Sequence, residues 1–173
     1  MTDILYKKAD SSDLDSVCVL VAAAVGRMSA DGIDQWDEVY PSREVLRGDI
    51  ERGDMYICSI DSAYVGMYVL NKDTDEQYAN GAWSYNSDDY MVIHRLVVSP
   101  AFQHKGLARQ IMKHIEDELR ASGVKAVRLD VFTKNPYALR LYDSQGYAKV
   151  GAAHWRKGEF YLMEKLLTGE KKA

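Results

Sequence analysis

Proline, cysteine and long apolar runs are scarce in this sequence of 173 residues. Its three prolines are too few for a proline-rich linker. Its two cysteines, Cys18 and Cys58, lack the CxxC spacing of many metal and redox sites, so we expect buried thiols in a reducing compartment. The longest apolar run, 17–25, is far shorter than the roughly 20 residues that span a bilayer.

An excess of basic residues is also missing. Asp and Glu number 26 against 22 Lys and Arg, which gives a net charge of −4. Proteins that bind phosphate backbones normally present a basic face, so a nucleic-acid partner is disfavoured. Lys7 and Lys8 imitate the start of a secretory leader, but Asp10, Asp13 and Asp15 separate them from the apolar run. We therefore expect a cytoplasmic protein without a membrane segment.

The composition that is present is that of a globular protein. Apolar residues make up 47% and charged residues 28% of the chain. The length favours a single domain, which we expect over residues 1–167, with a frayed polar tail over 168–173.

Hydrophobic periodicity predicts alternating strands and helices. Helices are expected to begin at Ser11 or Ser12, at Ser42, at Leu107 and at Asn135-Pro136. A β-bulge is expected at Gly66, and a long loop or ragged hairpin at 71–89. The expected strands are 4–8, 55–60, 63–70, 90–98, 126–132, 148–155 and 159–166.

The order of these elements predicts the fold class. The strand–helix–strand unit over 90–132 requires two parallel strands joined by a right-handed crossover, whereas the flanking hairpins require antiparallel pairs. We expect a mixed α/β fold with a central, mostly antiparallel sheet of about six or seven strands, flanked by about four helices. A doubly wound nucleotide-binding fold is disfavoured.

The segment between Pro100 and Leu107 precedes the helix with the strongest apolar periodicity. The start of a helix leaves about four N–H groups without partners and carries partial positive charge, and Gly106 would let an anion approach the backbone. Lys105 and Arg109 add positive charge, so the segment indicates a phosphate-containing ligand or, alternatively, an ordinary loop. Neither GxxxxGK[ST] nor GxGxxG occurs, which disfavours an NTPase or a dinucleotide dehydrogenase.

Two blocks of residues resemble a known family. Residues 103–108, Gln-His-Lys-Gly-Leu-Ala, are similar to the Q-x-x-G-x-[GA] acetyl-CoA loop of GNAT-superfamily N-acetyltransferases. Residues 135–147 resemble the family's N-x-x-[SA]-x-x-[FL]-Y-x-x-x-G-[FY] segment at every position. Segments 32–36, 40–42 and 93–96 also resemble a bacterial group of unassigned acceptor within the superfamily. The resemblance implies the GNAT fold and acetyl transfer from acetyl-CoA to an amine in a ternary complex.

The resemblance also implies roles for individual residues. Tyr142 would protonate the departing coenzyme thiolate, because a phenol with a pKa near 10 keeps its proton at neutral pH. Packing of its ring on the sheet is the alternative role. Backbone groups of Leu96, Val97 and Val98 would pair with the pantetheine arm, and one amide would polarise the thioester carbonyl. The other residues implied to contact the coenzyme are Gln103, His104, Lys105, Gly106, Leu107, Ala108 and Asn135.

The general base is less well determined. His94 stands where the family often has a glutamate, and its ordinary pKa of about 6.5 suits the role. A structural histidine is the alternative, in which case Glu159 or a chain of water molecules would take the proton. The four histidines have no metal-ligand spacing, so we expect no metal.

The acceptor site is expected near Trp36 and Tyr40. Four acids, Asp31, Asp34, Asp37 and Glu38, flank these aromatic residues without an intervening base, and 73–89 holds five more acids. Acidic, aromatic-lined openings attract cations, so a small cationic amine is the expected acceptor; solvated acidic loops are the alternative. Two other functions stay open, an idle acyl-CoA-binding sensor and a phosphate-binding interaction module, as does assembly into a homodimer.

Overall fold

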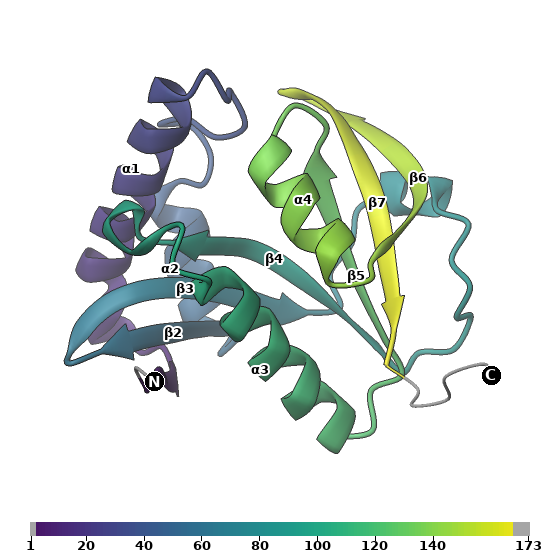
Figure 1. The fold of residues 1–173 in the computed structure, drawn as a ribbon, viewed down its shortest axis with the longest axis horizontal. Coiled ribbons are helices and arrows are strands. Elements are labelled where there is room, and N and C mark those ends of the chain that lie inside the picture. The colour runs from purple at the N-terminus through teal and green to yellow at the C-terminus, as the bar shows by residue number, and fades with distance from the viewer. Residues whose placement is uncertain (1–2, 168–173) are drawn as a thin grey trace. The chain divides into compact units, whose positions relative to one another are not determined.

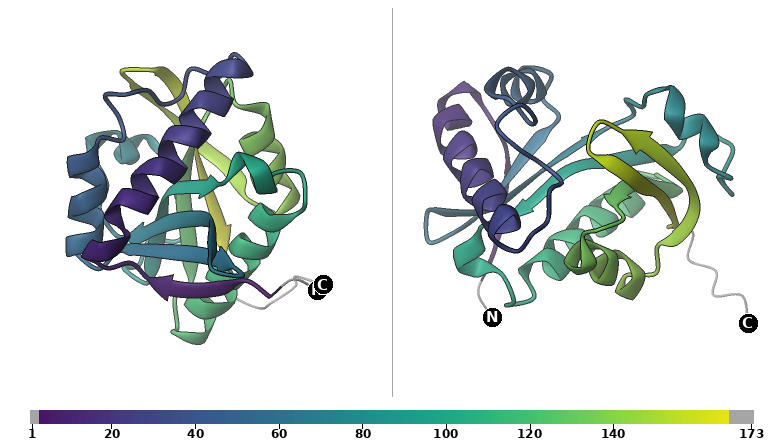
Figure 2. Two further views of the ribbon diagram at one scale, coloured as in Figure 1. Left: turned by 90° about the vertical axis from the view of Figure 1, so that its left-hand side faces the viewer. Right: turned by 90° about the horizontal axis from the view of Figure 1, so that it is seen from above.

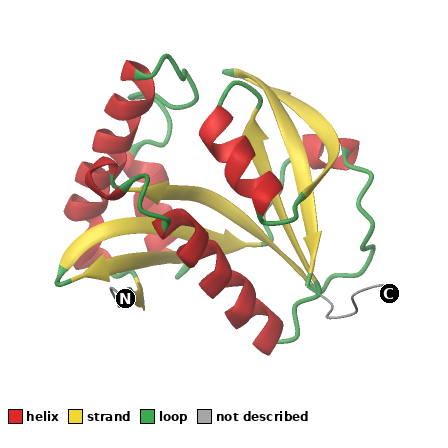
Figure 3. Cartoon of the chain, in the orientation of Figure 1, coloured by secondary structure: helices red, strands yellow, loops and turns green. Residues whose placement is uncertain are grey.

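A computed structural model describes residues 3–167 of the chain (Figure 1). The expected tail over 168–173 lies outside the described residues. Figure 3 distinguishes the helices, strands and loops by colour. The elements are β1 (Leu5–Lys8), α1 (Leu14–Ala30), α2 (Arg43–Glu51), β2 (Met55–Ile60), β3 (Ala63–Asn71), β4 (Tyr90–Val98), α3 (Leu107–Ala121), β5 (Ala126–Phe132), α4 (Pro136–Ser144), β6 (Ala148–Trp155) and β7 (Gly158–Leu166).

The strands form one hydrogen-bonded sheet with the order β1-β2-β3-β4-β5-β7-β6. β4 and β5 run parallel, with a register from Tyr90 opposite Ala126 to Val92 opposite Arg128. The pairs β1–β2, β2–β3, β5–β7 and β6–β7 are antiparallel. This is the expected mixed, mostly antiparallel sheet, and the prediction of the fold class is confirmed.

The contacts divide the described chain into two compact units. The first unit comprises the residues up to Leu70 together with His94–Ala108, and the second comprises Asn71–Ile93 together with the residues from Arg109 onward. Each unit has its own buried residues.

The core of the first unit lies between its helices and its strands. Buried residues of α1 and α2 form one core with alternate residues of β2 and β3. Met55 opposes Val69 and Ile57 opposes Met67, so both cross-strand pairs point to the same face. The buried apolar residues of this core are Ala9, Leu14, Val17, Leu20, Val21, Ala24, Leu46, Ile50, Met55, Ile57, Met67, Val69 and Val97.

In the second unit, the segment 71–89 is a loop with a single 3₁₀ helix at Glu76–Asn80. Of the two expected forms, the structure therefore has the loop. The 3₁₀ helix and α4 lie on different sides of β5, β7 and β6 (Figure 2). Tyr78 of the 3₁₀ helix is buried and packs with a cluster of residues comprising Trp83, Tyr90, Val92, Val150, Ala153, Trp155 and Leu162.

Gly151 of β6 explains how closely the 71–89 loop approaches the sheet. A Cβ atom at Gly151 would lie 2.6 Å from the carbonyl oxygen of Asn80, closer than any side chain allows. The Ala82 amide donates to the Val150 carbonyl at 2.8 Å in the same place. Glycine is therefore required at this position.

The sequence predicted two local features with different success. The bulge at Gly66 is confirmed, because Cys58 opposes Gly66 whereas Ser59 opposes Tyr64, which leaves Val65 as the extra residue. The expected cap at Ser11 or Ser12 is wrong. Asp10 caps a 3₁₀ turn that precedes α1: its side chain accepts from the Ser12 amide, and Asp13 accepts in return from the Asp10 amide.

None of the helices within residues 3–167 combines the length and apolar character that a membrane crossing requires.

Both cysteines are free thiols, but only one is fully buried. Cys58 on β2 has no exposed surface, and burial raises the pKa of its thiol to about 12. Cys18 on α1 is partly exposed. The expectation of buried thiols therefore holds fully for Cys58 and partly for Cys18.

We predict that Ellman's reagent modifies Cys18 and spares Cys58 in the native protein at about pH 8, because the thiolate is the reactive form and Cys58 is inaccessible. Absorbance of the released product, measured before and after addition of guanidinium, counts the thiols in each state. Equal modification rates of both thiols in the native protein would contradict the burial of Cys58.

Candidate active site

The segment between β4 and α3 is held in place by three hydrogen bonds. The Ser99 amide donates to the Val65 carbonyl at 2.8 Å, which fastens the end of β4 to the bulge in β3. The Phe102 amide closes a 3₁₀ turn on the Ser99 carbonyl. The Gln103 side chain then donates through Nε2 to the Val98 carbonyl at 3.2 Å. The glutamine of the sequence motif thus links the loop to the strand.

The loop ends in two residues with left-handed backbone conformation. His104 has φ +61° and Gly106 has φ +76°, and α3 begins directly afterward at Leu107. A Cβ atom at Gly106 would meet no atom within 4 Å, so the space above this backbone is open. The first amides of α3 have no partner within the helix by its geometry. The loop over residues 103–108 therefore leaves backbone and space open at the start of α3, as the expected phosphate contact requires.

The two cations expected beside this loop have protein partners. Lys105 donates to the Ala101 carbonyl at 3.3 Å and lies 5.2 Å from the centre of the Phe102 ring. Arg109, in the second unit, donates to the Ser144 hydroxyl at 3.2 Å. Both side chains are therefore already engaged by protein groups.

β4 contains the three residues whose backbone is expected to contact the coenzyme arm. It pairs in parallel with β5 up to Val92, and three residues later Arg95 has a left-handed backbone with φ +48°. Such a conformation interrupts the regular pleat of a strand. After it, Val97 is buried in the core of the first unit, whereas Leu96 and Val98 are half-buried.

His94 directly precedes this irregularity. Its side chain is half-buried, and its Nε2 atom is removed from solvent. Glu159, the alternative base, is half-exposed at the start of β7 in the second unit and lies 3.4 Å from His154. Within the described residues, no three His, Cys, Asp or Glu side chains gather closely enough to hold a metal ion.

The second unit holds Asn135 and Tyr142 at opposite ends of α4. Asn135 is buried and caps the helix, accepting the Ala138 amide at 3.1 Å. Tyr142 is buried, with its ring at 5.8 Å from the Tyr147 ring in an edge-on contact. Burial, and to a lesser degree the charge of Asp130, raises the pKa of the Tyr142 phenol. The hydroxyl therefore stays protonated at neutral pH and can act as a proton donor.

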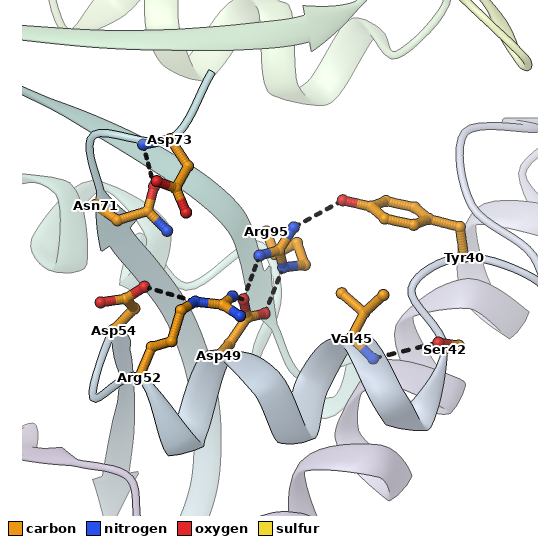
Figure 4. Close-up of polar contacts among 9 residues, drawn as sticks. All are labelled: Tyr40, Ser42, Val45, Asp49, Arg52, Asp54, Asn71, Asp73 and Arg95. Atoms are coloured by element: carbon orange, nitrogen blue, oxygen red, sulfur yellow. Dashed lines mark hydrogen bonds and ion pairs between the residues drawn. The ribbon is translucent and has the colours of Figure 1, made fainter. Parts of the chain in front are cut away.

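The aromatic residues expected at the acceptor site lie in the loop between α1 and α2. Trp36 is partly buried against the core of the first unit. Tyr40 is 39% exposed, and its hydroxyl accepts a hydrogen bond of 2.7 Å from Nη1 of Arg95 (Figure 4). Of the nearby acids, Asp31 pairs with Arg27, and the Asp37 carboxylate accepts the amides of Val39 and Tyr40. Some of the expected negative charge thus has a structural role.

Sequence reasoning missed the partners of Tyr40. Asp49 on α2 is fully buried and binds Arg95 through both carboxylate oxygens, at 2.6 and 2.8 Å. Arg52 donates to the same carboxylate at 2.6 Å. Burial raises the pKa of Asp49, and the two arginines oppose that shift. The only local signal was the place of Asp49 on the apolar face of α2, next to Ile50.

The comparisons with known proteins agree with this geometry. The model of the acetyltransferase (GNAT) family matches residues 27–147. This is more than half of the chain, which therefore belongs to the GNAT family of acetyltransferases. The resemblance to this family read from residues 103–108 and 135–147 is confirmed.

Individual relatives show how far the likeness extends. The [ribosomal protein bS18]-alanine N-acetyltransferase of Salmonella typhimurium is 37% identical over 78 residues, which cover 45% of this chain and 53% of that protein. The chain thus spans about half the length of this relative.

Solved structures resemble the fold over nearly the whole chain. A GNAT-family acetyltransferase from Streptococcus agalactiae has a TM-score of 0.84 and 21% identity, covering 94% of this chain and 95% of that one. The PaiA N-acetyltransferase from Thermoplasma acidophilum, in complex with coenzyme A, has a TM-score of 0.71 and 18% identity. The match covers 95% of this chain and 99% of that one. At these identities, the likeness establishes the fold.

We predict that Gly106→Glu abolishes acetyl-CoA binding in a folded protein. The side chain would occupy the open space above the loop, and its charge would repel phosphate. Calorimetric titration with acetyl-CoA measures the loss.

Gly123→Glu is the matched control for this substitution. Gly123 follows the other end of α3, has φ +87°, and also has no atom within 4 Å of a built Cβ. Both variants pay a similar backbone cost of about 1–2 kcal/mol, so only Gly106→Glu should lose binding. Equal affinity in the two folded variants would remove the loop from the coenzyme site.

Proposed function

We propose that this protein transfers an acetyl group from acetyl-CoA directly to a primary amine, and that the acceptor is a small cationic metabolite. The observation that carries the proposal is the open Gly106 backbone at the start of α3, tied to β4 through Gln103. Family membership supports acetyl transfer, and the complex of the Thermoplasma acidophilum protein with coenzyme A supports the same coenzyme here.

Several backbone groups would hold the coenzyme. The amides of residues 103–108 bind the pyrophosphate, as the partial positive charge of a helix start favours. The backbone of residues 96–98 pairs with the pantetheine arm, and one amide polarises the thioester carbonyl. Asn135 contributes its amide nitrogen, because its Oδ1 atom is engaged in capping α4. Acetyl-CoA supplies the activated acetyl group.

The side chains move the protons. The neutral amine forms a bond to the acetyl carbon, and the carbon–sulfur bond breaks. Tyr142 donates its phenolic proton to the sulfur, while His94 takes the proton that the amine loses. Glu159 or a water chain is the alternative acceptor of that proton. Proton donors and acceptors of this kind typically contribute roughly 10²–10⁴-fold in rate.

The proposal that the acceptor is cationic rests on residues of the loop between α1 and α2. Trp36 and Tyr40 offer aromatic surface for a cation, and Asp34 and Glu38 add negative charge beside them. Asp31 and Asp37 contribute less, because one is paired with an arginine and the other binds backbone amides.

A protein N-terminus is a second candidate acceptor. It is favoured by the relative from Salmonella typhimurium, which is an alanine N-acetyltransferase of a ribosomal protein. A catalytically idle acyl-CoA sensor is less well supported, because such a protein would not need the buried phenol of Tyr142. The match to the GNAT family likewise argues against an unrelated phosphate-binding module.

We predict that Tyr142→Phe lowers the single-turnover rate by roughly 10²-fold and leaves acetyl-CoA affinity unchanged, because the ring remains and only the proton donor is lost. Rapid-quench measurement with saturating acetyl-CoA gives the rate without interference from product release.

Tyr147→Phe is the control for the packing role of a buried tyrosine. Its hydroxyl donates to Glu116 at 3.1 Å, so its loss should reduce the melting temperature without slowing the chemistry. If both variants retain the wild-type single-turnover rate, Tyr142 is a packing residue.

We further predict that cationic amines react faster than neutral amines of equal size, and that salt reduces their advantage, since the Debye length is only about 8 Å at physiological ionic strength. Thiol release with acetyl-CoA, over a panel that includes polyamines, neutral amines and peptides beginning with alanine, measures this preference. Fastest turnover of the alanine peptides would favour the protein N-terminus. Binding of acetyl-CoA without thiol release from any amine would favour the sensor.

A further inference from the structure

We propose that Asp49 is a positioning residue for the acceptor: through Arg95 it fixes the hydroxyl of Tyr40, and with it the loop between α1 and α2. This inference rests on the proposed function, in which that loop lines the acceptor site. All the residues involved belong to the first unit and are drawn together in Figure 4.

Asp49 fixes the orientation of the Arg95 guanidinium. Nε and Nη2 bind the two carboxylate oxygens of Asp49, at 2.8 and 2.6 Å, in the planar two-point geometry that only arginine provides. The Asp49 side chain has no exposed surface, and that of Arg95 is only 11% exposed. Rotation of the guanidinium would therefore leave a charged carboxylate buried without its principal partner.

The remaining nitrogen of the Arg95 guanidinium binds Tyr40. With Nε and Nη2 engaged, Nη1 donates to the Tyr40 hydroxyl oxygen at 2.7 Å. The hydroxyl accepts this bond, so its own proton is directed away from Arg95 and is available to a ligand. Tyr40 is 39% exposed, which leaves its ring and hydroxyl within reach of an acceptor.

The loop between α1 and α2 has contacts within itself and one contact with β4. Inside the loop, Asp37 binds the amides of Val39 and Tyr40, so its tip is stiff in itself. The bond from Arg95 connects that tip to β4, at a residue 55 positions further along the chain. Asp49 thus acts on Tyr40 without touching it.

Tyr40→Phe tests the end of this connection. It removes the hydroxyl and keeps the ring, so the KM for a reactive acceptor amine should rise about tenfold, the equivalent of one hydrogen bond of ~1.4 kcal/mol. The kcat and the KM for acetyl-CoA should stay unchanged, a split that a general loss of stability would not produce.

Arg95→Lys and Asp49→Asn test the origin of the connection. Lysine keeps the charge beside Asp49 but has no second arm for Tyr40, so Arg95→Lys should raise the acceptor KM as Tyr40→Phe does. It also serves as the test if Asp49→Asn fails to fold. Asp49→Asn should raise the same KM, and adding Tyr40→Phe to it should produce no further rise, because the hydroxyl has already lost its fixed partner.

Arg52→Gln is the matched control. Arg52 also donates to Asp49, but it does not bind Tyr40. This variant should lower the melting temperature and leave the acceptor KM unchanged. Additive effects of Tyr40→Phe and Asp49→Asn, or an equal rise in KM in Arg52→Gln, would overturn the proposal.

Hydrogen–deuterium exchange of the 33–40 segment provides a readout that does not need an active enzyme. Tyr40→Phe and Arg95→Lys should speed exchange in this segment, whereas Arg52→Gln should not. Faster exchange in a protein that acetylates no amine would refute the proposed function and keep the connection. Unchanged exchange and KM in an active enzyme would refute the connection alone.

Discussion

The ion pair between Asp49 and Arg95 joins parts of the first unit that lie far apart in the sequence. It links α2 to β4 at the one residue of that strand whose backbone is left-handed. For an L-residue this conformation costs about 1–2 kcal/mol, and the buried carboxylate is itself expensive without a partner. The ion pair offsets both costs, and Arg52 is a second partner of the carboxylate. The irregularity of β4 at Arg95, helix α2 and the loop with Tyr40 are therefore joined by the contacts of one arginine.

Much of the fold could be predicted because its signals are local. The Asn135-Pro136 cap and the left-handed Gly146 that follows α4 mark the start and end of one short helix within a few residues. The strand–helix–strand unit around α3 was recognised from periodicity alone. The cap of α1 was misplaced because three capping residues, Asp10, Ser11 and Ser12, stand in a row, and the 3₁₀ turn that decides between them has no separate signal.

Helix-start chemistry alone pointed to the segment before Leu107, and the family blocks gave individual positions in the candidate site. Residues 103–108 and α4 are covered by those blocks, and the structure gives the loop an open glycine and the helix a buried phenol. Asp49 and Arg95 are 46 positions apart. Hydrophobic periodicity places Asp49 on the apolar face of a helix, but it does not predict which strand residue the carboxylate will contact. The local roles of the acids were not predictable for a similar reason: a count of charges does not show that the Asp37 and Asp75 carboxylates accept hydrogen bonds from backbone amides.

The burial of the Tyr142 phenol also bears on how activity should depend on alkaline pH. Burial raises the pKa of this group above its ordinary value, so in the proposed mechanism its phenolate would be costly and would readily regain a proton. A loss of activity at moderately high pH would consequently report some other ionisation, in the acceptor, the coenzyme or elsewhere in the protein. The same desolvation makes the Tyr142 phenol a weaker acid and moves its own titration further above neutral pH.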